Sequence, residues 1–316
     1  MKYAFFTCFN RDYMVTGLTL YRSLKALGMD FTLLVCALDA ETYDVLCELK
    51  ASGESLEPFR LEDLESTEPA LADCKKARNF AEYIFTLSPL MPSYIFAAHP
   101  ELDVIIYLDA DLFFFKEPSE LMREFEQSGG AVMIMEHGFT PKQEWRMEFG
   151  RFNVEFQVYR RGASDEILAW WRGKCLEWCF DRLENGRFAD QKYLDEWPER
   201  FHGVAIARDP RAGIAPWNWP LRPVEEPVFY HFQGFRWLSR HFISHNLGSY
   251  GQVMPPHLLE KYYRRYAYEQ LATRDWLRGR FPKSGFDPWK GRRRDGFGVL
   301  RGIASALRHR NLMAVK

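Results

Sequence analysis

Residues 104 to 115 read VIIYLDADLFFF, two aspartates set inside a run of apolar residues. In an extended chain, residues two apart point to the same face, so this pattern predicts that Asp109 and Asp111 converge. Burying two like charges together is costly unless a cation lies between them. Carboxylate oxygens suit Mg²⁺ and Mn²⁺. The stretch therefore predicts a metal site at the carboxyl edge of a sheet, where open α/β sheets bind ligands. The alternative is a turn in which both aspartates cap backbone amides.

Strand-length apolar runs alternate with helical patterns on both sides of this stretch, which is typical of a mostly parallel sheet flanked by helices. The class is α/β, and the amino-terminal hundred residues indicate a nucleotide-binding half. No GxGxxG and no GxxxxGK[ST] occurs, so a dinucleotide fingerprint and a P-loop are excluded. Strands are predicted at 3–9, 31–38, 104–115, 131–135 and 152–159, and helices at 15–27, 40–50, 81–98 (broken by Pro89 and Pro92), 119–127, 165–180 and 190–197.

Composition narrows the class of partner. A net charge of −1 over 316 residues gives no reason to expect nucleic acid as a partner. Aromatic residues make up 16% of the chain, which suits a carbohydrate enzyme, although core packing accounts for most of them. Six cysteines without metal spacing, early charged residues and no run of eighteen apolar residues predict a cytoplasmic protein with reduced thiols.

Five segments stand out in order along the chain: TCFNRDY at 7–13, YLDADLFFF at 107–115, FNVEFQVYRR at 152–161, DQKYL at 190–194 and HFQGF at 231–235. Together they resemble motifs of the GT-A glycosyltransferases, in particular their family 8-like group. The stretch DQKYLDEWPERF at 190–201, followed by APWNW at 215–219, also resembles a bacterial branch of surface-polysaccharide transferases. The resemblance spans roughly residues 1–240 and implies a GT-A, Rossmann-like fold and transfer of a sugar from a nucleotide-diphosphate donor.

The resemblance implies a role for each motif. Asp109, Asp111 and His231 would hold Mn²⁺ or Mg²⁺, and Asp109 would also touch the donor ribose. Asp190 and Gln191 would lie at the anomeric carbon and stabilise the transition state. The remaining motif residues would bind the donor, with UDP-sugar as its class: Thr7, Tyr13, Asn153 and Gly234.

Three positions depart from the family pattern. Glu155 stands where the family has glycine, which brings a carboxylate toward the sugar pocket. The Lys-Pro-Trp after HFxG is missing, and Arg236 is the expected diphosphate contact in its place. The first loop lacks the acidic pair before its tyrosine. Retention is the stereochemistry that the resemblance implies. Glu155 as nucleophile and Asp190 as general base of an inverting reaction are alternatives.

Several side chains keep two interpretations. Arg78 has the fork that matches a diphosphate, and a solvated arginine is its alternative. Tyr13 would either stack on the nucleotide base of the donor or pack against other side chains of the protein. Trp217 and Trp219 stack on sugar or fill the core.

The carboxyl-terminal segment is basic, with eleven Lys or Arg from Arg278 to Lys316 against two Asp. Phe297, Leu300, Ile303, Ala304 and Leu307 recur at helical spacing, which predicts a basic amphipathic helix. Such a helix contacts the inner face of a membrane, packs on the catalytic domain or mediates dimerisation. We expect a catalytic domain at 1–250, with a nucleotide-sugar half at 1–118 and an acceptor half at 119–250. A helical extension follows at 251–316.

The function predicted is a metal-dependent glycosyltransferase of polysaccharide biosynthesis acting on a glycan or lipid-linked acceptor. A non-catalytic nucleotide-sugar or carbohydrate-binding protein is the alternative from another class. A sugar-1-phosphate nucleotidyltransferase is disfavoured because TCFNRDY contains no glycine.

Overall fold

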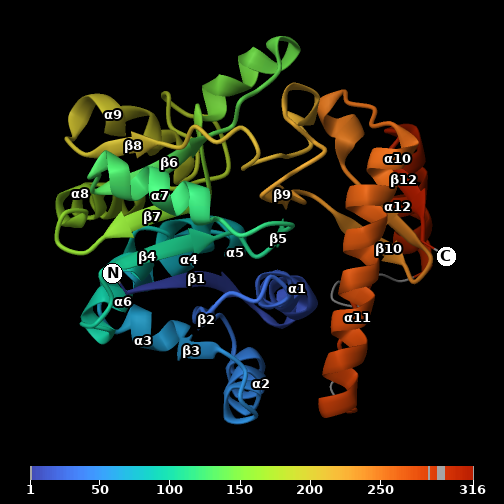
Figure 1. Cartoon of the computed structure of the whole chain (residues 1–316), viewed down its shortest axis with the longest axis horizontal. Helices are drawn as coiled ribbons and strands as arrows, with labels where there is room; N and C mark the ends of the chain where they lie inside the picture. The colour runs from blue at the N-terminus through green and yellow to red at the C-terminus, as the bar shows by residue number, and fades with distance from the viewer. Residues whose placement is uncertain (1, 284, 290–295, 316) are drawn as a thin grey trace. The chain divides into compact units, whose positions relative to one another are not determined.

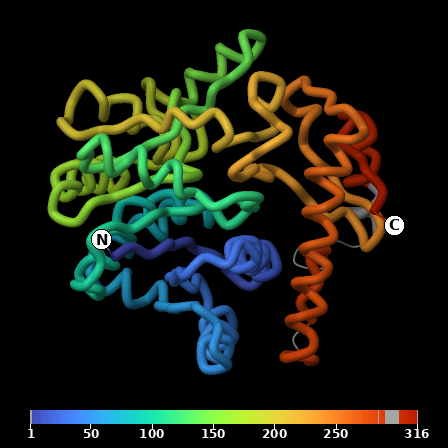
Figure 2. The backbone as a smooth tube through the Cα atoms, viewed as in Figure 1, coloured from blue at the N-terminus to red at the C-terminus, as the bar shows by residue number. Residues whose placement is uncertain are grey.

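A computed structural model describes residues 2–283, 285–289 and 296–315, without the side chains of 296–300. The chain forms two compact units, and each unit combines three separate segments. The first unit contains residues 1–8, 30–109 and 118–209, and the second contains residues 9–29, 110–117 and 210–316. Segments far apart in the sequence share a unit: α1 (Met14–Lys25), blue in Figure 2, and α11 (Arg265–Arg280), orange, both belong to the second unit.

A seven-stranded sheet is the frame of the first unit, in the order β3-β2-β1-β4-β7-β6-β8 (Figure 1). Parallel pairing joins β1 to β4, β2 to β3 and β6 to β8, whereas β7 runs antiparallel to both of its neighbours. The predicted α/β class with a mainly parallel sheet is confirmed. The strands are β1 (Tyr3–Phe9), β2 (Leu33–Ala37), β3 (Leu56–Arg60), β4 (Val104–Leu108), β6 (Val132–Glu136), β7 (Phe152–Arg160) and β8 (Val204–Ile206).

Helices flank this sheet. Side-chain caps begin two of them: Asp39 accepts from the Thr42 amide, and Asn79 and Glu82 form a reciprocal capping box. The helices are α2 (Ala40–Ala51), α3 (Leu61–Glu65), α4 (Leu71–Ala77), α5 (Phe80–Leu87), α6 (Leu90–Ala98), α7 (Ser119–Ser128), α8 (Asp165–Glu177) and α9 (Trp197–Arg200), with 3-10 turns η2 (Pro141–Phe149) and η3 (Gln191–Glu196).

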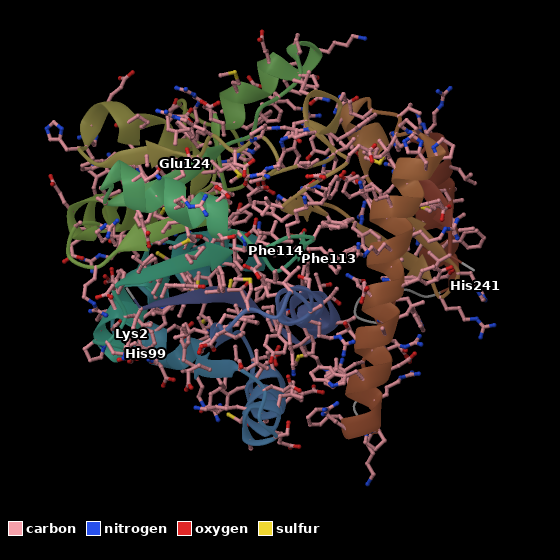
Figure 3. All side chains as sticks on the ribbon, viewed as in Figure 1. Lys2, His99, Phe113, Phe114, Glu124 and His241 are labelled. Carbon is pink, nitrogen blue, oxygen red and sulfur yellow. The ribbon has the colours of Figure 1, made fainter. Side chains whose placement is uncertain are left out.

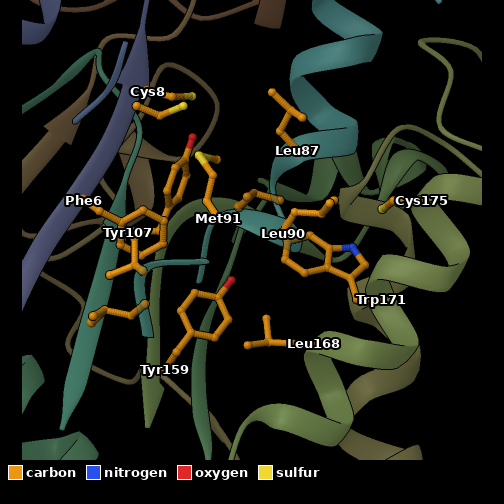
Figure 4. Close-up of a cluster of buried hydrophobic side chains, with 14 of the residues drawn as sticks. Phe6, Cys8, Leu87, Leu90, Met91, Tyr107, Tyr159, Leu168, Trp171 and Cys175 are labelled. Atoms are coloured by element: carbon orange, nitrogen blue, oxygen red, sulfur yellow. The ribbon is translucent and has the colours of Figure 1, made fainter. Parts of the chain in front are cut away.

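The core of the first unit packs helix side chains against β1, β4 and β7. Phe6, Tyr107 and Tyr159 lie on the sheet side of this cluster, and Leu168 and Trp171 of α8 lie on the helix side (Figure 4). Trp171 is fully buried, and its indole nitrogen donates to the backbone oxygen of Asp190 at 3.0 Å. Apolar packing thereby fixes the backbone of a predicted catalytic residue.

The second unit joins the first helix of the chain to its last third. Helix α1 packs against α11, and a buried hydrogen bond of 3.0 Å links the hydroxyls of Thr19 and Thr273. Its strands are β5 (Leu112–Phe114), β9 (Phe229–His231), β10 (Arg236–Ser239), β11 (Phe242–Ser244) and β12 (Leu312–Ala314). Its helices are α1 (Met14–Lys25), α10 (Pro256–Leu259), α11 (Arg265–Arg280) and α12 (Gly296–Arg308), with the 3-10 turns η1 (Arg11–Tyr13), η4 (Trp219–Leu221) and η5 (Leu247–Tyr250) and the π-helical turn η6 (Glu260–Arg264).

Aromatic rings fill the core of this unit. Phe113 of β5, labelled beside Phe114 in Figure 3, contacts Tyr266 with ring centroids 6.0 Å apart. Phe232 stacks on the same tyrosine at 3.8 Å, nearly parallel to it. These aromatic side chains therefore pack in the core of the second unit, as expected for most of the aromatic residues of the chain.

The structure corrects the prediction of one strand over residues 104–115. Strand β4 ends at Leu108, where the amide of Asp109 donates to the oxygen of Glu155, and β5 begins at Leu112 in a different, two-stranded sheet. Asp109 and Asp111 therefore lie in the connection between two strands. The apolar run hides this change of sheet because both strands are buried.

Two helix predictions also need correction. Pro92 lies inside α6, where it is tolerated because it falls in the first turn, so Pro89 alone separates α5 from α6. The helix predicted at 190–197 is the 3-10 turn η3 followed by α9. The first helix ends at Lys25 with Ala26 as its cap, so Gly28, at a φ of +76°, lies two residues beyond the cap and not at it as expected.

The predicted carboxyl-terminal helix is present as α12. Leu307 is 59% exposed, and the exposed side chains of Arg301, Arg308 and Arg310 lie in the same segment. The side chains of Phe297 and Leu300 lie outside the described residues. No helix in the described part of the chain has the length and apolar character to cross a membrane. Contact with a membrane surface stays a prediction.

Candidate active site

A carboxylate and an imidazole face each other at the start of β5. Register pairs Leu112 with His231, and the Asp111 backbone oxygen accepts from the amide of Phe232. His231 Nε2 lies 3.1 Å from Asp111 Oδ1, and the imidazole is buried with Trp217 edge-on to it at 5.5 Å. The antiparallel pairing of β5 and β9 thus brings together two residues 120 positions apart in the sequence.

Asp109 completes a set of three side chains that can act as metal ligands. Its Oδ1 accepts from the Tyr107 hydroxyl at 2.8 Å. Asp109, Asp111 and His231 each offer one ligand atom, and these atoms lie within 4.8 Å of one another. Two carboxylate oxygens and one imidazole nitrogen fit a divalent cation such as Mn²⁺ or Mg²⁺. The predicted Asp-Asp-His set can therefore bind a metal ion.

Asp190 is a buried carboxylate in the first unit. The Ser88 hydroxyl donates to its Oδ2 at 2.6 Å, and only 4% of the residue is exposed. Burial raises the pKa of Asp190 to about 7, an effect that the hydrogen bond from Ser88 opposes and the charge of Asp109 reinforces. A carboxyl group with this pKa exchanges its proton near neutral pH, as a catalytic group requires.

The backbone directly before Asp190 is strained. Ala189 has a φ of +46°, in the left-handed region that a residue with a side chain rarely adopts. Its amide donates to the oxygen of Phe180 at 3.0 Å, which helps to hold this conformation. Strain of this kind gathers at functional sites, because the surrounding structure keeps a side chain in a position that the free backbone avoids.

Asn153 and Glu155 bind each other through two hydrogen bonds. Asn153 Nδ2 donates to Glu155 Oε2 at 2.8 Å, and the Glu155 amide donates to Asn153 Oδ1 at 3.0 Å. Glu155 is 1% exposed. The Glu155 carboxylate is therefore held by its neighbour on β7, and its role as nucleophile stays a prediction.

Two other predicted residues form hydrogen bonds within the first unit, and a third is buried there. Gln191 Nε2 donates to the oxygen of Phe149 at 2.8 Å. Arg78 is buried, where its guanidinium donates to the Leu176 oxygen at 2.8 Å and to the Thr86 hydroxyl. Thr7 is fully buried in β1. These contacts give Arg78 a packing role in place of the solvated one, and the donor-binding roles of Arg78 and Thr7 stay predictions.

A pocket of about 340 Å³ lies within the second unit. Four residues that the sequence singled out line it: Tyr13, Asp111, Gly234 and Arg236. Both Tyr13, at 49% exposed, and Arg236 keep exposed surface. The other lining residues are Asp12, Thr16, Gln233, Phe235, Trp237, Tyr266, Gln270, Pro288 and Trp289.

Replacing Gly234 by alanine should destabilise this pocket. Gly234 has a φ of +73°, and an added Cβ would lie 2.1 Å from Nδ2 of Asn246, whose side chain is hydrogen-bonded to Gln233. Backbone strain and the clash together should lower the free energy of unfolding by about 2 to 4 kcal/mol. Urea unfolding measures this change in the free energy of unfolding. The control is Gly279→Ala in α11, where nothing lies within 4 Å and stability should rise by about 1 kcal/mol. Equal effects of both changes would contradict this account.

Reasoning from the sequence missed the pocket residues that follow position 240. Tyr266 and Gln270 are one helical turn apart on α11, which is a spacing that could have flagged them. Nothing in the sequence ties that turn to TCFNRDY or HFQGF. Asp12 also lines the pocket, directly before Tyr13.

No protein-family model matches the chain. Two proteins of Bacillus subtilis (strain 168) are similar to it in sequence. The uncharacterized protein YfnF is 28% identical over 76% of this chain and 84% of its own length. The uncharacterized protein YfnD is 27% identical over 90% of this chain and 94% of its own length.

Solved structures of glycosyltransferases resemble the chain at low sequence identity. The glycosyltransferase GlyE of Streptococcus pneumoniae TIGR4 matches with a TM-score of 0.53 at 14% identity, over 89% of this chain and 64% of GlyE. The galactosyltransferase LgtC, solved with donor and acceptor sugar analogues, matches with a TM-score of 0.51 at 14% identity, over 73% of this chain and 87% of LgtC. The chain has the fold of these GT-A glycosyltransferases.

Proposed function

We propose that the chain is a metal-dependent glycosyltransferase that moves a sugar from a nucleotide-diphosphate donor, a UDP-sugar, to a glycan or lipid-linked acceptor. One observation carries the proposal: Asp111 belongs both to the Asp-Asp-His set and to the lining of the 340 Å³ pocket. A ligand in this pocket therefore lies beside a residue that can hold a divalent cation. The fold shared with GlyE and LgtC supports this reading.

The chain's own residues would divide the work of sugar transfer. Breaking the bond from the anomeric carbon to the diphosphate leaves negative charge on the leaving oxygen. A divalent cation held by Asp109, Asp111 and His231 supplies Lewis-acid neutralisation of that charge when bound. The guanidinium of Arg236 adds a fork that matches phosphate oxygens. The ring of Tyr13, a half-exposed residue, would stack on the nucleotide base.

In this proposal Asp190 orients the donor sugar and stabilises positive charge at the anomeric carbon, with Gln191 beside it. The reaction retains the anomeric configuration. Mn²⁺ is the favoured ion, because an imidazole is a better ligand for Mn²⁺ than for Mg²⁺. The catalytic domain covers residues 1–250. The proposed setting is polysaccharide biosynthesis in the cytoplasm, where the basic helix α12 contacts the membrane's inner face.

The test is donor hydrolysis by the purified protein, screened across nucleotide sugars with and without Mn²⁺. We expect release of the nucleoside diphosphate from one donor, dependent on the cation. Nuclear magnetic resonance of the transferred sugar then reports its anomeric configuration. Binding of a nucleotide sugar without turnover, even with candidate acceptors present, would favour a non-catalytic binding protein. No binding of any donor would overturn the proposal.

A further inference from the structure

Gln233 lies at the centre of a turn that starts beside Asp111. The amide of Phe232 donates to the backbone oxygen of Asp111 at 3.0 Å, and the oxygen of Phe232 accepts from the amide of Phe235 at 2.8 Å. The second bond closes a β-turn around Gln233 and Gly234, and the φ of +73° at Gly234 suits the third position of a type II turn. Gln233 therefore directly follows the residue bonded to Asp111, and both line the 340 Å³ pocket.

Contacts with Asn246 fix the orientation of the Gln233 side-chain amide. Asn246 Nδ2 lies 3.2 Å from the backbone oxygen of Gln233, and because a carbonyl oxygen can only accept, this atom of Asn246 is a donor. The same Nδ2 lies 3.1 Å from the Gln233 side chain, which therefore turns its Oε1 toward Asn246. The hydroxyl of Tyr250 donates to this Oε1 at 2.9 Å. Neither Asn246 nor Tyr250 lines the pocket, so the oxygen end of the amide points away from it.

The nitrogen end of the same amide is accessible. Nε2 of Gln233 has no hydrogen-bond partner among the described residues, and it is not one of the buried polar atoms that lack a partner. The residue is half-buried, so Nε2 keeps surface that a ligand can reach. Because two donors hold the oxygen end, the N–H groups are oriented before a ligand arrives, and binding costs little side-chain entropy.

The neighbours of Gln233 in the pocket indicate which part of a ligand it meets. Asp111 belongs to the set that can hold a divalent cation, and Arg236, three residues after Gln233, is exposed. Divalent cations and guanidinium groups both bind phosphate oxygens. An amide N–H in the same pocket adds a hydrogen bond to an anionic oxygen.

We propose that Gln233 Nε2 donates a hydrogen bond to a phosphate oxygen of the nucleotide-diphosphate donor, and that Asn246 and Tyr250 hold the amide in position for it. This inference rests on the proposed function and adds a donor-binding side chain to it.

The test compares Gln233→Glu with Gln233→Met by isothermal titration into the full chain in the presence of Mn²⁺. Uridine, guanosine, adenosine, cytidine and thymidine diphosphates are titrated into the wild type, and the one bound most tightly is then titrated into the variants. Glutamate keeps the oxygen that accepts from Asn246 and Tyr250 but places a second oxygen against the phosphate, whereas methionine removes both ends of the amide. We expect Gln233→Met to weaken binding roughly tenfold and Gln233→Glu at least about a hundredfold. Gln127→Glu, which adds the same charge at an exposed position on α7, should bind like the wild type.

Urea unfolding of the unliganded variants separates binding from structure. Methionine takes a side-chain acceptor away from Asn246 and Tyr250, so Gln233→Met should be the less stable variant although it binds the diphosphate more tightly. A purely structural role of Gln233 predicts the reverse order of affinity, with Gln233→Glu close to the wild type. That order, or an affinity equal to the wild type in either variant, overturns this inference alone. If the wild type binds no nucleoside diphosphate, the proposed function fails instead.

Discussion

Replacing Asp111 by asparagine should lower the rate of donor turnover by about a thousandfold, because a cation at the leaving group supplies several kcal/mol of stabilisation. Asp111 is the residue common to the metal-ligand set and the pocket. Asparagine keeps the size of the side chain but removes its charge. The affinity for Mn²⁺, measured by titration with electron paramagnetic resonance, should fall at least about tenfold.

The same change should leave the fold intact. The side chain of Asp111 is 23% exposed and its ion pair with His231 forms only when the imidazole is protonated, so the free energy of unfolding should change by less than about 1 kcal/mol. Glu166→Gln is the matched control, because it removes a charge from an exposed position on α8. Turnover that survives Asp111→Asn, or falls equally in both variants, would show that this carboxylate does not hold a catalytic cation.

Much of the fold follows from local patterns in the sequence. Local patterns predict β1 at its observed bounds and α2 to within one residue, because a buried strand is a short continuous apolar run and a helix has a longer repeat ended by turn residues. The direction of individual strands was not predicted. Strand β7 alternates apolar and polar residues in FNVEFQVYR, and it runs antiparallel to β4 and β6. Direction depends on the connections around it.

Some residues of the candidate site could likewise be predicted from the sequence, and others could not. Asp111 and His231 were predicted from short motifs, and the pairing of β5 with β9 places them 3.1 Å apart. The face-sharing argument for Asp109 and Asp111 was wrong, since the two lie in a turn, although their ligand atoms still converge with His231. Tyr266 could not be predicted, because it is an ordinary aromatic residue on a helix until the fold brings it to the pocket.

Replacing Asp190 by asparagine should have opposite effects on activity and stability. If Asp190 stabilises charge at the anomeric carbon, turnover should fall by about a hundred- to a thousandfold. Stability should rise at alkaline pH. Burial raises the pKa of Asp190 from 3.8 to about 7, so the folded protein binds its proton more tightly than the unfolded chain does. Stability is therefore lost as pH rises from about 4 to about 7, and asparagine has no such loss.

The measurement is urea unfolding of protein freed of divalent cations, at pH 5 and pH 8. The stability gained by Asp190→Asn should be about 2.5 kcal/mol larger at pH 8 than at pH 5. Titration of other groups is common to both proteins and cancels in this difference. Ser88→Ala provides the companion test, because losing the hydrogen bond to the ionised carboxylate should raise the pKa of Asp190 further and steepen the loss of stability.

A carboxylate that lowers stability at neutral pH, beside an alanine at a φ of +46°, is hard to explain by packing alone. Function is the natural reason to keep such a residue, since active sites commonly give up stability for activity. The paired measurement decides the matter. Lower turnover with higher stability at pH 8 identifies Asp190 as a functional group. Lower stability of Asp190→Asn at both pH values would make it a structural residue and remove it from the mechanism.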